Sequence, residues 1–252
     1  MTNNPIAKYI VIGLSIILTA FVLGKGLKNR NAAEDSIAVV GLGTKDFTSD
    51  EITWSGTYSA KAADAKEAYT IINADREKVK AFFISKGFVA SEFVFGGVDF
   101  SKAYRKIEVS REDNVVKTED IQDGYVATQS ITFTSKKNPA LMQKIEMVMN
   151  QTAELVNSGI EFNAAGAQYT YSDLPSLKHN LIEKATQDAR ERAEKIVKTA
   201  HGDLSKLKEA SMGVFQITGK NSVEEDSYGG NNDTYNKEKT ARITVRLTYE
   251  LD

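Results

Sequence analysis

Four carboxylates in one polar segment are the residues whose types and spacing come closest to a metal site. The segment, residues 219–238 (GKNSVEEDSYGGNNDTYNKE), is rich in Gly and Asn and has no hydrophobic periodicity. Carboxylate oxygens suit calcium, but their spacing here is not that of an EF-hand loop. We therefore expect an exposed hairpin tip or loop without a metal ion. The four carboxylates are Glu224, Glu225, Asp226 and Asp233, and the segment's fifth carboxylate, Glu238, is its last residue.

Other residues able to do chemistry are few and dispersed. The chain has no cysteine, and its two histidines, His179 and His201, lie on one predicted helix. This excludes thiolate chemistry and disulfides, and it disfavours a histidine metal centre. Close carboxylate pairs are common on solvated faces, so they do not identify a general acid and base. Those pairs are Glu108 with Glu112, and Glu119 with Asp120.

Motifs of familiar enzyme classes are missing from the sequence. We find no GxSxG elbow, HExxH helix, phosphate loop or dinucleotide-binding fingerprint. The GLGTKD segment at residues 41–46 lacks a third glycine and leads into a strand, so we expect a turn and not a phosphate cradle. Trp54 lies on an alternating strand, where core packing or subunit contact is the ordinary role. The sequence thus predicts no catalytic, cofactor-binding or metal-binding residue, and no enzyme.

The charge distribution disfavours nucleic acid as a partner. The 252 residues include 32 basic and 34 acidic side chains, and the first 30 residues carry basic charges alone, on Lys8, Lys25, Lys28 and Arg30. The remainder is therefore mildly acidic, whereas non-specific nucleic-acid binding needs a basic surface that displaces counterions.

Residues 1–30 predict a membrane anchor or a signal segment. A charge-free run, YIVIGLSIILTAFVLG at residues 9–24, is flanked by basic residues. Its length is at the short end for a bilayer span, so a signal-peptide core is the alternative. A good cleavage site is missing, and we expect an uncleaved, single-pass transmembrane helix. Residues 31–35 are typical of a short polar linker.

Beyond residue 36, strand and helix patterns follow one another. Period-two alternation predicts strands at 37–43, 51–61, 121–137, 167–171, 204–218 and 240–251, with one or two more between 88 and 113. Helical stripes that begin at a capping residue predict helices at 64–87, 138–159 and 173–202.

This order favours an α+β fold, with mostly antiparallel sheets and helices packed on one face, preceded by the N-terminal transmembrane helix. The strands have one polar face, whereas strands of a doubly covered parallel sheet would be apolar on both. The α+β domain spans residues 36–252 and forms either one unit or two subdomains.

The most highly charged stretch, ARERAEKIVKTAHGDL at residues 189–204, predicts a helix packed on a sheet. Its charges have both signs and fall in i,i+4 pairs, whereas a nucleic-acid-binding helix would carry an unbalanced basic face. We expect Gly202 in the C-terminal turn. The expected buried stripe is Leu177, Leu181, Ala185, Ala189, Ala193, Ile196 and Ala200, flanked by Ile182 and Val197; the expected pairs are Lys184–Asp188, Arg190–Glu194, Glu191–Lys195 and Glu194–Lys198.

Several of these segments resemble a known family. The alanine-rich DARERAEKIVKTAHGDL, followed by a strand ending near GVFQI, resembles the C-terminal signature of the SIMPL-domain family of bacterial envelope proteins. IAVVGLGTKDFTSDEITWSGTYSA resembles its opening strand pair, and ARITVRLTYEL its closing strand. GYVATQSITFTS, a helix and LVNSGIEF resemble its central strand–helix–strand unit. The resemblance extends from about residue 36 to 252, with FVFGGVDFSKAYRK as the weakest fit.

The resemblance implies an exported protein. It places the chain in the inner membrane with its C-terminal domain in the periplasm or, as the alternative, in the periplasm after signal cleavage. The positive-inside rule argues for the opposite orientation, because the flank after residue 24 is the more basic one. The resemblance also implies a homo-oligomer, since at least one member forms a ring-like, channel-shaped assembly, and it implies a connection with oxidative-stress defence.

Two functional hypotheses follow. The first is a membrane-anchored envelope protein that acts through oligomeric assembly or protein interaction. The alternative is a small-ligand-binding protein or enzyme that uses a cleft between two α+β subdomains, with an unknown ligand. The resemblance supplies no catalytic residue for either hypothesis.

Overall fold

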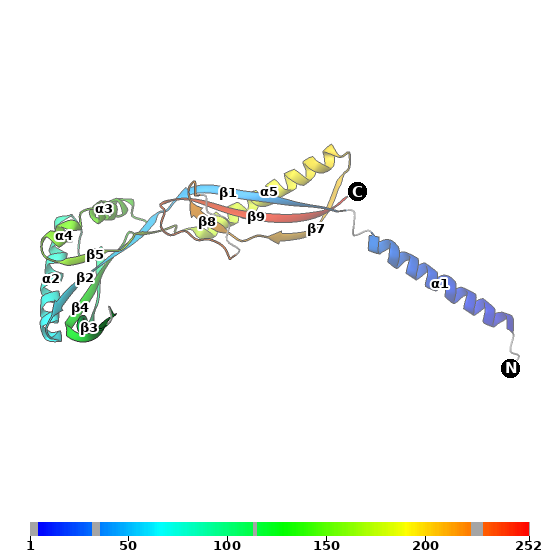
Figure 1. The fold of residues 1–252 in the computed structure, drawn as a ribbon. Coiled ribbons are helices and arrows are strands. Elements are labelled where there is room, and N and C mark those ends of the chain that lie inside the picture. Colours follow the sequence, from blue (N-terminus) through cyan, green and yellow to red (C-terminus); the bar gives the residue numbers. More distant parts are fainter. Residues whose placement is uncertain (1–4, 32–35, 113–114, 223–228, 252) are drawn as a thin grey trace. The chain divides into compact units, whose positions relative to one another are not determined.

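The computed structural model describes residues 5–31, 36–112, 115–222 and 229–251, and it shows an α+β protein (Figure 1). The helices are α1 (Pro5–Asn31), α2 (Ala65–Ser85), α3 (Pro139–Met149), α4 (Ala153–Asn157) and α5 (Leu174–Thr199). The strands are β1 (Ser36–Thr48), β2 (Glu51–Ala62), β3 (Phe93–Glu112), β4 (Val115–Thr134), β5 (Glu161–Ala164), β6 (Gln168–Thr170), β7 (Leu204–Met212), β8 (Gln216–Gly219) and β9 (Glu238–Leu251).

The strands form two sheets. One sheet has the order β1-β9-β7, with β8 also paired to β9; the other has the order β3-β4-β2-β5, with β6 also paired to β2. The pairings of β2 with β4, β5 and β6, of β3 with β4, and of β7 with β9 are antiparallel. The predicted fold class, α+β with antiparallel sheets, is therefore confirmed.

Helix α1 contains the predicted run at residues 9–24. No helix in the described part of the chain combines the length and the apolarity that crossing a membrane requires. The predicted transmembrane helix is therefore not supported. Of the expected linker at residues 31–35, Asn31 ends α1 and the other four residues lie outside the described ranges.

The chain forms two compact units, each built from segments that are distant in sequence. Unit 1 comprises Met1–Lys45, Leu177–Phe215 and Arg242–Asp252, and unit 2 comprises Asp46–Ser176 and Gln216–Ala241.

Unit 2 holds an aromatic core between helices and the sheet of β2 and β4. The predicted alternation in β2 is confirmed, because Ile52, Trp54, Tyr58 and Ala60 are buried. Helix α2 begins as predicted: the Asp64 carboxylate accepts a hydrogen bond of 2.8 Å from the backbone N–H of Glu67. The α2 side chains that pack inward are Ala68, Ile72, Val79 and Phe83, whereas Tyr69 is 48% exposed.

Some predicted boundaries in unit 2 were confirmed and others were wrong. The one or two strands predicted between residues 88 and 113 are one long strand, β3, in which the Gly96–Gly97 pair produces a bulge between Phe95 and Val98, so this prediction holds. The predicted helix at 138–159 breaks at Asn150, whose side-chain amide bonds the carbonyl of Glu146 and competes with the helical backbone. The short strand β5 was not predicted from periodicity.

Unit 1 consists of helix α5 packed against a sheet through small residues. Gly41 lies so close to the helix that an added Cβ would be 2.1 Å from the carbonyl oxygen of Ala185, and Gly43 lies equally close to Leu181. The predicted alanine stripe thus docks on β1, as expected. In β9 the predicted alternation is also confirmed, and its buried side chains are Ala241, Ile243, Val245, Leu247 and Tyr249.

The end of the α5 stripe departs from the prediction. The buried row advances in steps of four throughout, through Ala193 to Val197, and leaves Ile196 52% exposed. A row of i+4 steps runs obliquely along a helix, which fits a helix that crosses its neighbouring strands at an angle. The predicted strand at 204–218 is likewise two strands, β7 and β8, separated at residues 213–215.

Candidate interaction surfaces

The carboxylates of the acidic segment do not form a metal site where the structure describes them. Asp233 accepts hydrogen bonds from the backbone N–H groups of Tyr235 and Asn236, at 2.7 and 3.2 Å, and from the Asn236 side chain at 2.8 Å. Burial opposes ionisation, but the bonds from Asn236 and Tyr235 and the charge of Lys239 hold the pKa of Asp233 below its ordinary value. Its role is to stabilise a turn.

The remaining acidic candidates add no metal ligands. Glu224, Glu225 and Asp226 lie outside the described residues. Within the described ranges, no cluster of three or more His, Asp or Glu side chains could hold a metal ion.

The two histidines lie far apart near helix α5, and the GLGTKD segment has a structural role in a strand. His179 and His201 are exposed near opposite ends of α5. His201 adopts the left-handed conformation that ends the helix, with φ 63°, and the N–H of Gly202 bonds the carbonyl of Val197, so Gly202 lies in the C-terminal turn as expected. The turn expected at GLGTKD is wrong, because the segment lies inside β1, where its two glycines allow the approach of α5.

Trp54 belongs to the core of unit 2. Its indole is buried and stacks at 5.4 Å from the ring of Phe133, and its N–H donates a hydrogen bond of 3.0 Å to the carbonyl of Ala165. Because the indole is buried and its N–H is hydrogen-bonded, core packing accounts for Trp54 at this position and no ligand is needed.

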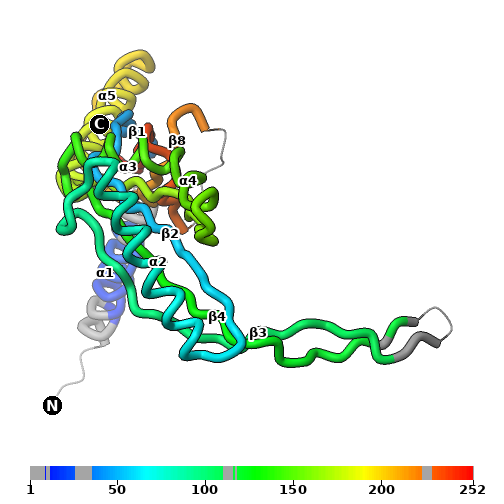
Figure 2. The backbone as a smooth tube through the Cα atoms, turned by 90° about the vertical axis from the view of Figure 1, so that its left-hand side faces the viewer, coloured from blue at the N-terminus to red at the C-terminus, as the bar shows by residue number. Residues whose placement is uncertain are grey.

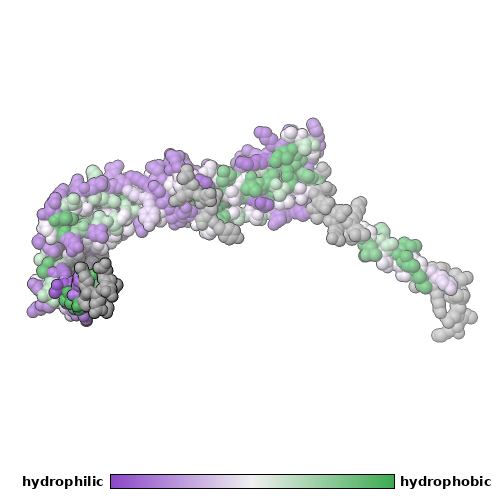
Figure 3. All heavy atoms as spheres, viewed as in Figure 1, coloured by the Kyte–Doolittle hydropathy of each residue, from purple (hydrophilic) through white to green (hydrophobic). Residues whose placement is uncertain are grey.

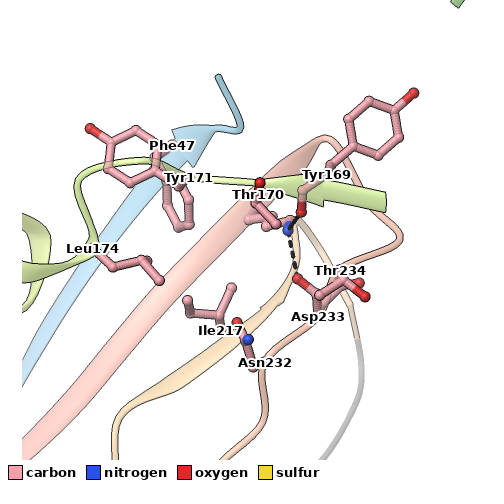
Figure 4. Close-up of a pocket in the computed structure, with 10 residues that line it drawn as sticks. Phe47, Tyr169, Thr170, Tyr171, Leu174, Ile217, Asn232, Asp233 and Thr234 are labelled. Carbon is pink, nitrogen blue, oxygen red and sulfur yellow. Dashed lines mark hydrogen bonds between the residues drawn. The ribbon is translucent and has the colours of Figure 1, made fainter. Parts of the chain in front are cut away.

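A small cavity in unit 2 lies beside a buried lysine (Figure 4). Lys239 is 3% exposed, and its ammonium donates hydrogen bonds of 2.6 and 2.5 Å to the backbone carbonyls of Tyr169 and Asp233. Burial lowers the pKa of Lys239. The cavity encloses about 40 Å³ between Phe47, Ile217 and these groups, which is room for a few water molecules at about 10–15 Å³ each.

The open edge of β1 forms a groove with helix α5 in unit 1. We call it the edge groove; it measures about 400 Å³ and is lined by Ala38, Val39, Val40, Arg192, Lys195 and Ile196. Figure 3 shows hydrophobic side chains gathered over β1 and α5, and Val40 and Ile196 are 42% and 52% exposed. The groove therefore combines apolar walls with basic side chains.

Asp188 lies next to the edge groove. Its carboxylate accepts a hydrogen bond of 2.8 Å from the backbone N–H of Leu42 and pairs with Arg192 at 2.9 Å. These two bonds, with the Leu42 amide contributing most, lower the pKa of Asp188. Of the four predicted helix pairs, Arg190–Glu194 is present at 2.7 Å, but Asp188 pairs with Arg192 in place of Lys184.

A two-stranded arm extends from the sheet of unit 2 (Figure 2). Strand β2 pairs with β4 as far as Ala62 opposite Tyr125, while β3 and β4 remain paired to Glu112 opposite Val115. We call residues 104–112 and 115–122 the hairpin arm. Its exposed apolar side chains include Tyr104 at 58%, Val109 at 55% and Val116 at 42%.

An ion cluster marks the base of the hairpin arm. Asp123 bonds the ammonium of Lys61 at 2.6 Å and lies 3.7 Å from the Arg105 guanidinium. The hydrogen bond from Lys61 lowers the pKa of Asp123. The close carboxylate pair Glu119 and Asp120, considered above from the sequence, lies farther along the arm. Both side chains are exposed.

Comparison with known families decides the classification. The pattern that defines SIMPL, described as a protein of unknown function (DUF541), matches residues 37–249. The chain belongs to the SIMPL family. The match confirms the resemblance derived from the alanine-rich helix and the flanking strands. No curated protein matches the chain.

Membership assigns the SIMPL chain no biochemical activity and no site residue, because the family description gives none. The edge groove and the hairpin arm were not predicted from the sequence either. Hydrophobic periodicity revealed the strands. It does not show which strand lies at the edge of a sheet, or how far a hairpin extends beyond the end of the strand next to it.

Proposed function

We propose that this SIMPL protein acts by assembly, through protein–protein contacts made with copies of itself or with another protein. The hairpin arm is the observation that carries this proposal. Its strands pair with each other alone beyond Tyr125 and expose apolar side chains on a solvated ribbon.

A partner would remedy the physical weakness of such an arm. An isolated two-stranded hairpin is marginally stable in water, and each of its outer edges presents backbone N–H and C=O groups to other strands. The exposed apolar side chains of the arm would gain free energy from burial against a partner. An arm in which β3 and β4 remain paired beyond the end of β2 is thus best explained as a contact element.

We also propose the cell envelope as the place of action, with the body of the chain in the periplasm and a role in envelope or oxidative-stress defence. The charge-free run at residues 9–24 and the family resemblance support export. The alternative, a ligand-binding protein or enzyme, gains no support from the cavity beside Lys239, because about 40 Å³ is too little for a metabolite.

Light scattering of the purified full chain over a hundredfold concentration range tests the proposed assembly. We expect a mass that rises with concentration or stays at a multiple of 27.7 kDa. A strict monomer that also captures no partner after cross-linking in cells would contradict the proposal.

A reporter fusion tests the compartment separately. Alkaline phosphatase joined after residue 35 should be active, because it folds only after export to an oxidising compartment. An inactive fusion that is present at normal levels would place the body on the cytoplasmic side.

A further inference from the structure

The outer edge of β1 has backbone groups available to an additional strand. Among the described strands, β1 lies at one edge of its sheet, and the N–H of Leu42 points away from the neighbouring strand to reach Asp188. Peptide groups alternate in direction along a strand, so those of Ala38 and Val40 point to the same open side. These two residues line the edge groove.

The side chains around these peptide groups define what kind of strand fits. Ile196 of α5 offers an apolar contact and Lys195 a positive charge, and both are exposed in the groove. Lys195 has no ion-pair partner among the residues that the structure describes. The groove therefore favours a strand that carries an acidic and an apolar side chain on one face.

The hairpin arm contains such a strand. In β4, Glu119 pairs with Ile107 and Ile121 pairs with Arg105, so Glu119 and Ile121 are two residues apart and share one face. Glu119 is exposed and, within the described ranges, forms no ion pair. Because β2 ends at Ala62 opposite Tyr125, this stretch of β4 has an outer edge without a neighbouring strand.

We infer that the hairpin arm of one copy adds to β1 of a second copy in the edge groove, with Glu119 next to Lys195 and Ile121 next to Ile196. Strand addition supplies backbone hydrogen bonds, and the alternating side chains set the specificity. This inference rests on the proposed function, since it names the contact through which the chain would assemble.

The contact joins two different surfaces and is therefore heterologous. Each copy keeps a free arm or a free groove until the series closes, so such contacts produce rings or open filaments and not isolated dimers. The opposite charges on the two surfaces also disfavour pairing of like with like.

Two charge reversals in the full chain test the contact. Lys195→Glu places two acidic groups together, and Glu119→Lys places two basic groups together. Each variant alone should raise the concentration at half-assembly about tenfold, as expected for like charges at an interface. Both side chains are exposed, so the thermal unfolding temperature should stay unchanged.

Mixing the two variants is the decisive measurement. In the mixture, each arm meets a groove of opposite charge on the other variant, so equimolar mixing should restore assembly to the wild-type concentration. A contact within one chain could not be repaired in this way. Lys184→Glu, an exposed reversal on α5 outside the groove, serves as the control and should assemble like the wild type.

The outcomes separate the inference from the proposed function. If the wild-type chain never assembles, the assembly function fails, and this contact fails with it. If the wild type assembles but neither reversal affects it, the contact is wrong while the assembly function stands. Loss of assembly that mixing does not restore, or an equal loss in Lys184→Glu, also overturns the contact.

Discussion

The backbone N–H of Leu42 donates a hydrogen bond of 2.8 Å to the carboxylate of Asp188, which joins the edge of β1 to helix α5. The same carboxylate pairs with Arg192 at 2.9 Å. One side chain thus satisfies an edge N–H that would otherwise be open to other strands, and it marks the end of the edge groove.

This bond predicts a dependence of stability on pH. The pKa of Asp188 is lower in the folded chain than in the unfolded chain, because the Leu42 amide and Arg192 stabilise the charged form. The contribution is therefore complete above the unfolded pKa, about 3.9, and is lost as the pH falls through the folded pKa. Asp188→Asn should unfold more easily than wild type at pH 7, with the difference shrinking toward pH 2. Urea unfolding at both pH values measures this; a difference that stays constant would contradict it.

The glycines of β1 predict a strict size limit at the helix contact. In Gly41→Ala, the new Cβ would lie 2.1 Å from the Ala185 carbonyl oxygen and 2.4 Å from the Ala189 nitrogen, so α5 must move away. We expect a loss of about 1–3 kcal/mol in the free energy of unfolding, the range for overpacking. Gly166→Ala is the matched control, because its Cβ would meet nothing within 4 Å. Chemical denaturation compares the two, and equal losses would refute the close packing.

Close packing of this kind was readable from the sequence because it depends on a local pattern. Small residues at steps of four, Ala185, Ala189 and Ala193, define a helix face that admits near approach, whatever the partner. The same logic gave β2 and β9, whose alternation reflects one wet face. In these elements local propensity and burial agree.

The rest depended on contacts that sequence spacing does not encode. Strand β2 ends its pairing at Ala62, whereas β3 and β4 stay paired beyond that point. This difference depends on how the strands pair, and the sequence of β4 alone does not show it. The exposure of Ile196 followed from the oblique path of the buried row along α5, which the angle between helix and sheet determines. The two candidate surfaces arise from these two facts.

From the hydrogen bonds of Lys239 we expect that replacing this residue destabilises the segment around Asp233 locally. Its ammonium donates to the backbone carbonyls of Tyr169 and Asp233, and Lys239→Met would remove both donors from a buried place. Each buried acceptor left unpaired costs about 1–3 kcal/mol. Hydrogen exchange should quicken at the N–H of Asp233, which bonds Ile217, while exchange in α5 stays unchanged. Uniform acceleration, or none, would contradict this role. Lys220→Met, which removes an exposed cation, is the control.

The hydrogen bond of the Tyr58 hydroxyl leads us to expect coupled losses in the free energy of unfolding when the core of unit 2 is mutated. It donates a hydrogen bond of 2.5 Å to the Gln129 side-chain oxygen, and the Gln129 amide donates one of 2.8 Å to the Gly96 carbonyl at the bulge of β3. Tyr58→Phe would leave the buried Gln129 oxygen without a donor, at a cost of about 1–3 kcal/mol. Tyr104→Phe removes a hydroxyl from a side chain that is 58% exposed and should cost less than about 0.5 kcal/mol.

A double-mutant cycle distinguishes this network from simple loss of packing. Gln129→Leu alone strands both the Tyr58 hydroxyl and the Gly96 carbonyl, whereas Tyr58→Phe combined with Gln129→Leu leaves no unpaired group between the two side chains. The double variant should therefore lose less free energy of unfolding than the two single losses added together. Strictly additive losses in chemical denaturation would mean that Tyr58 and Gln129 act independently.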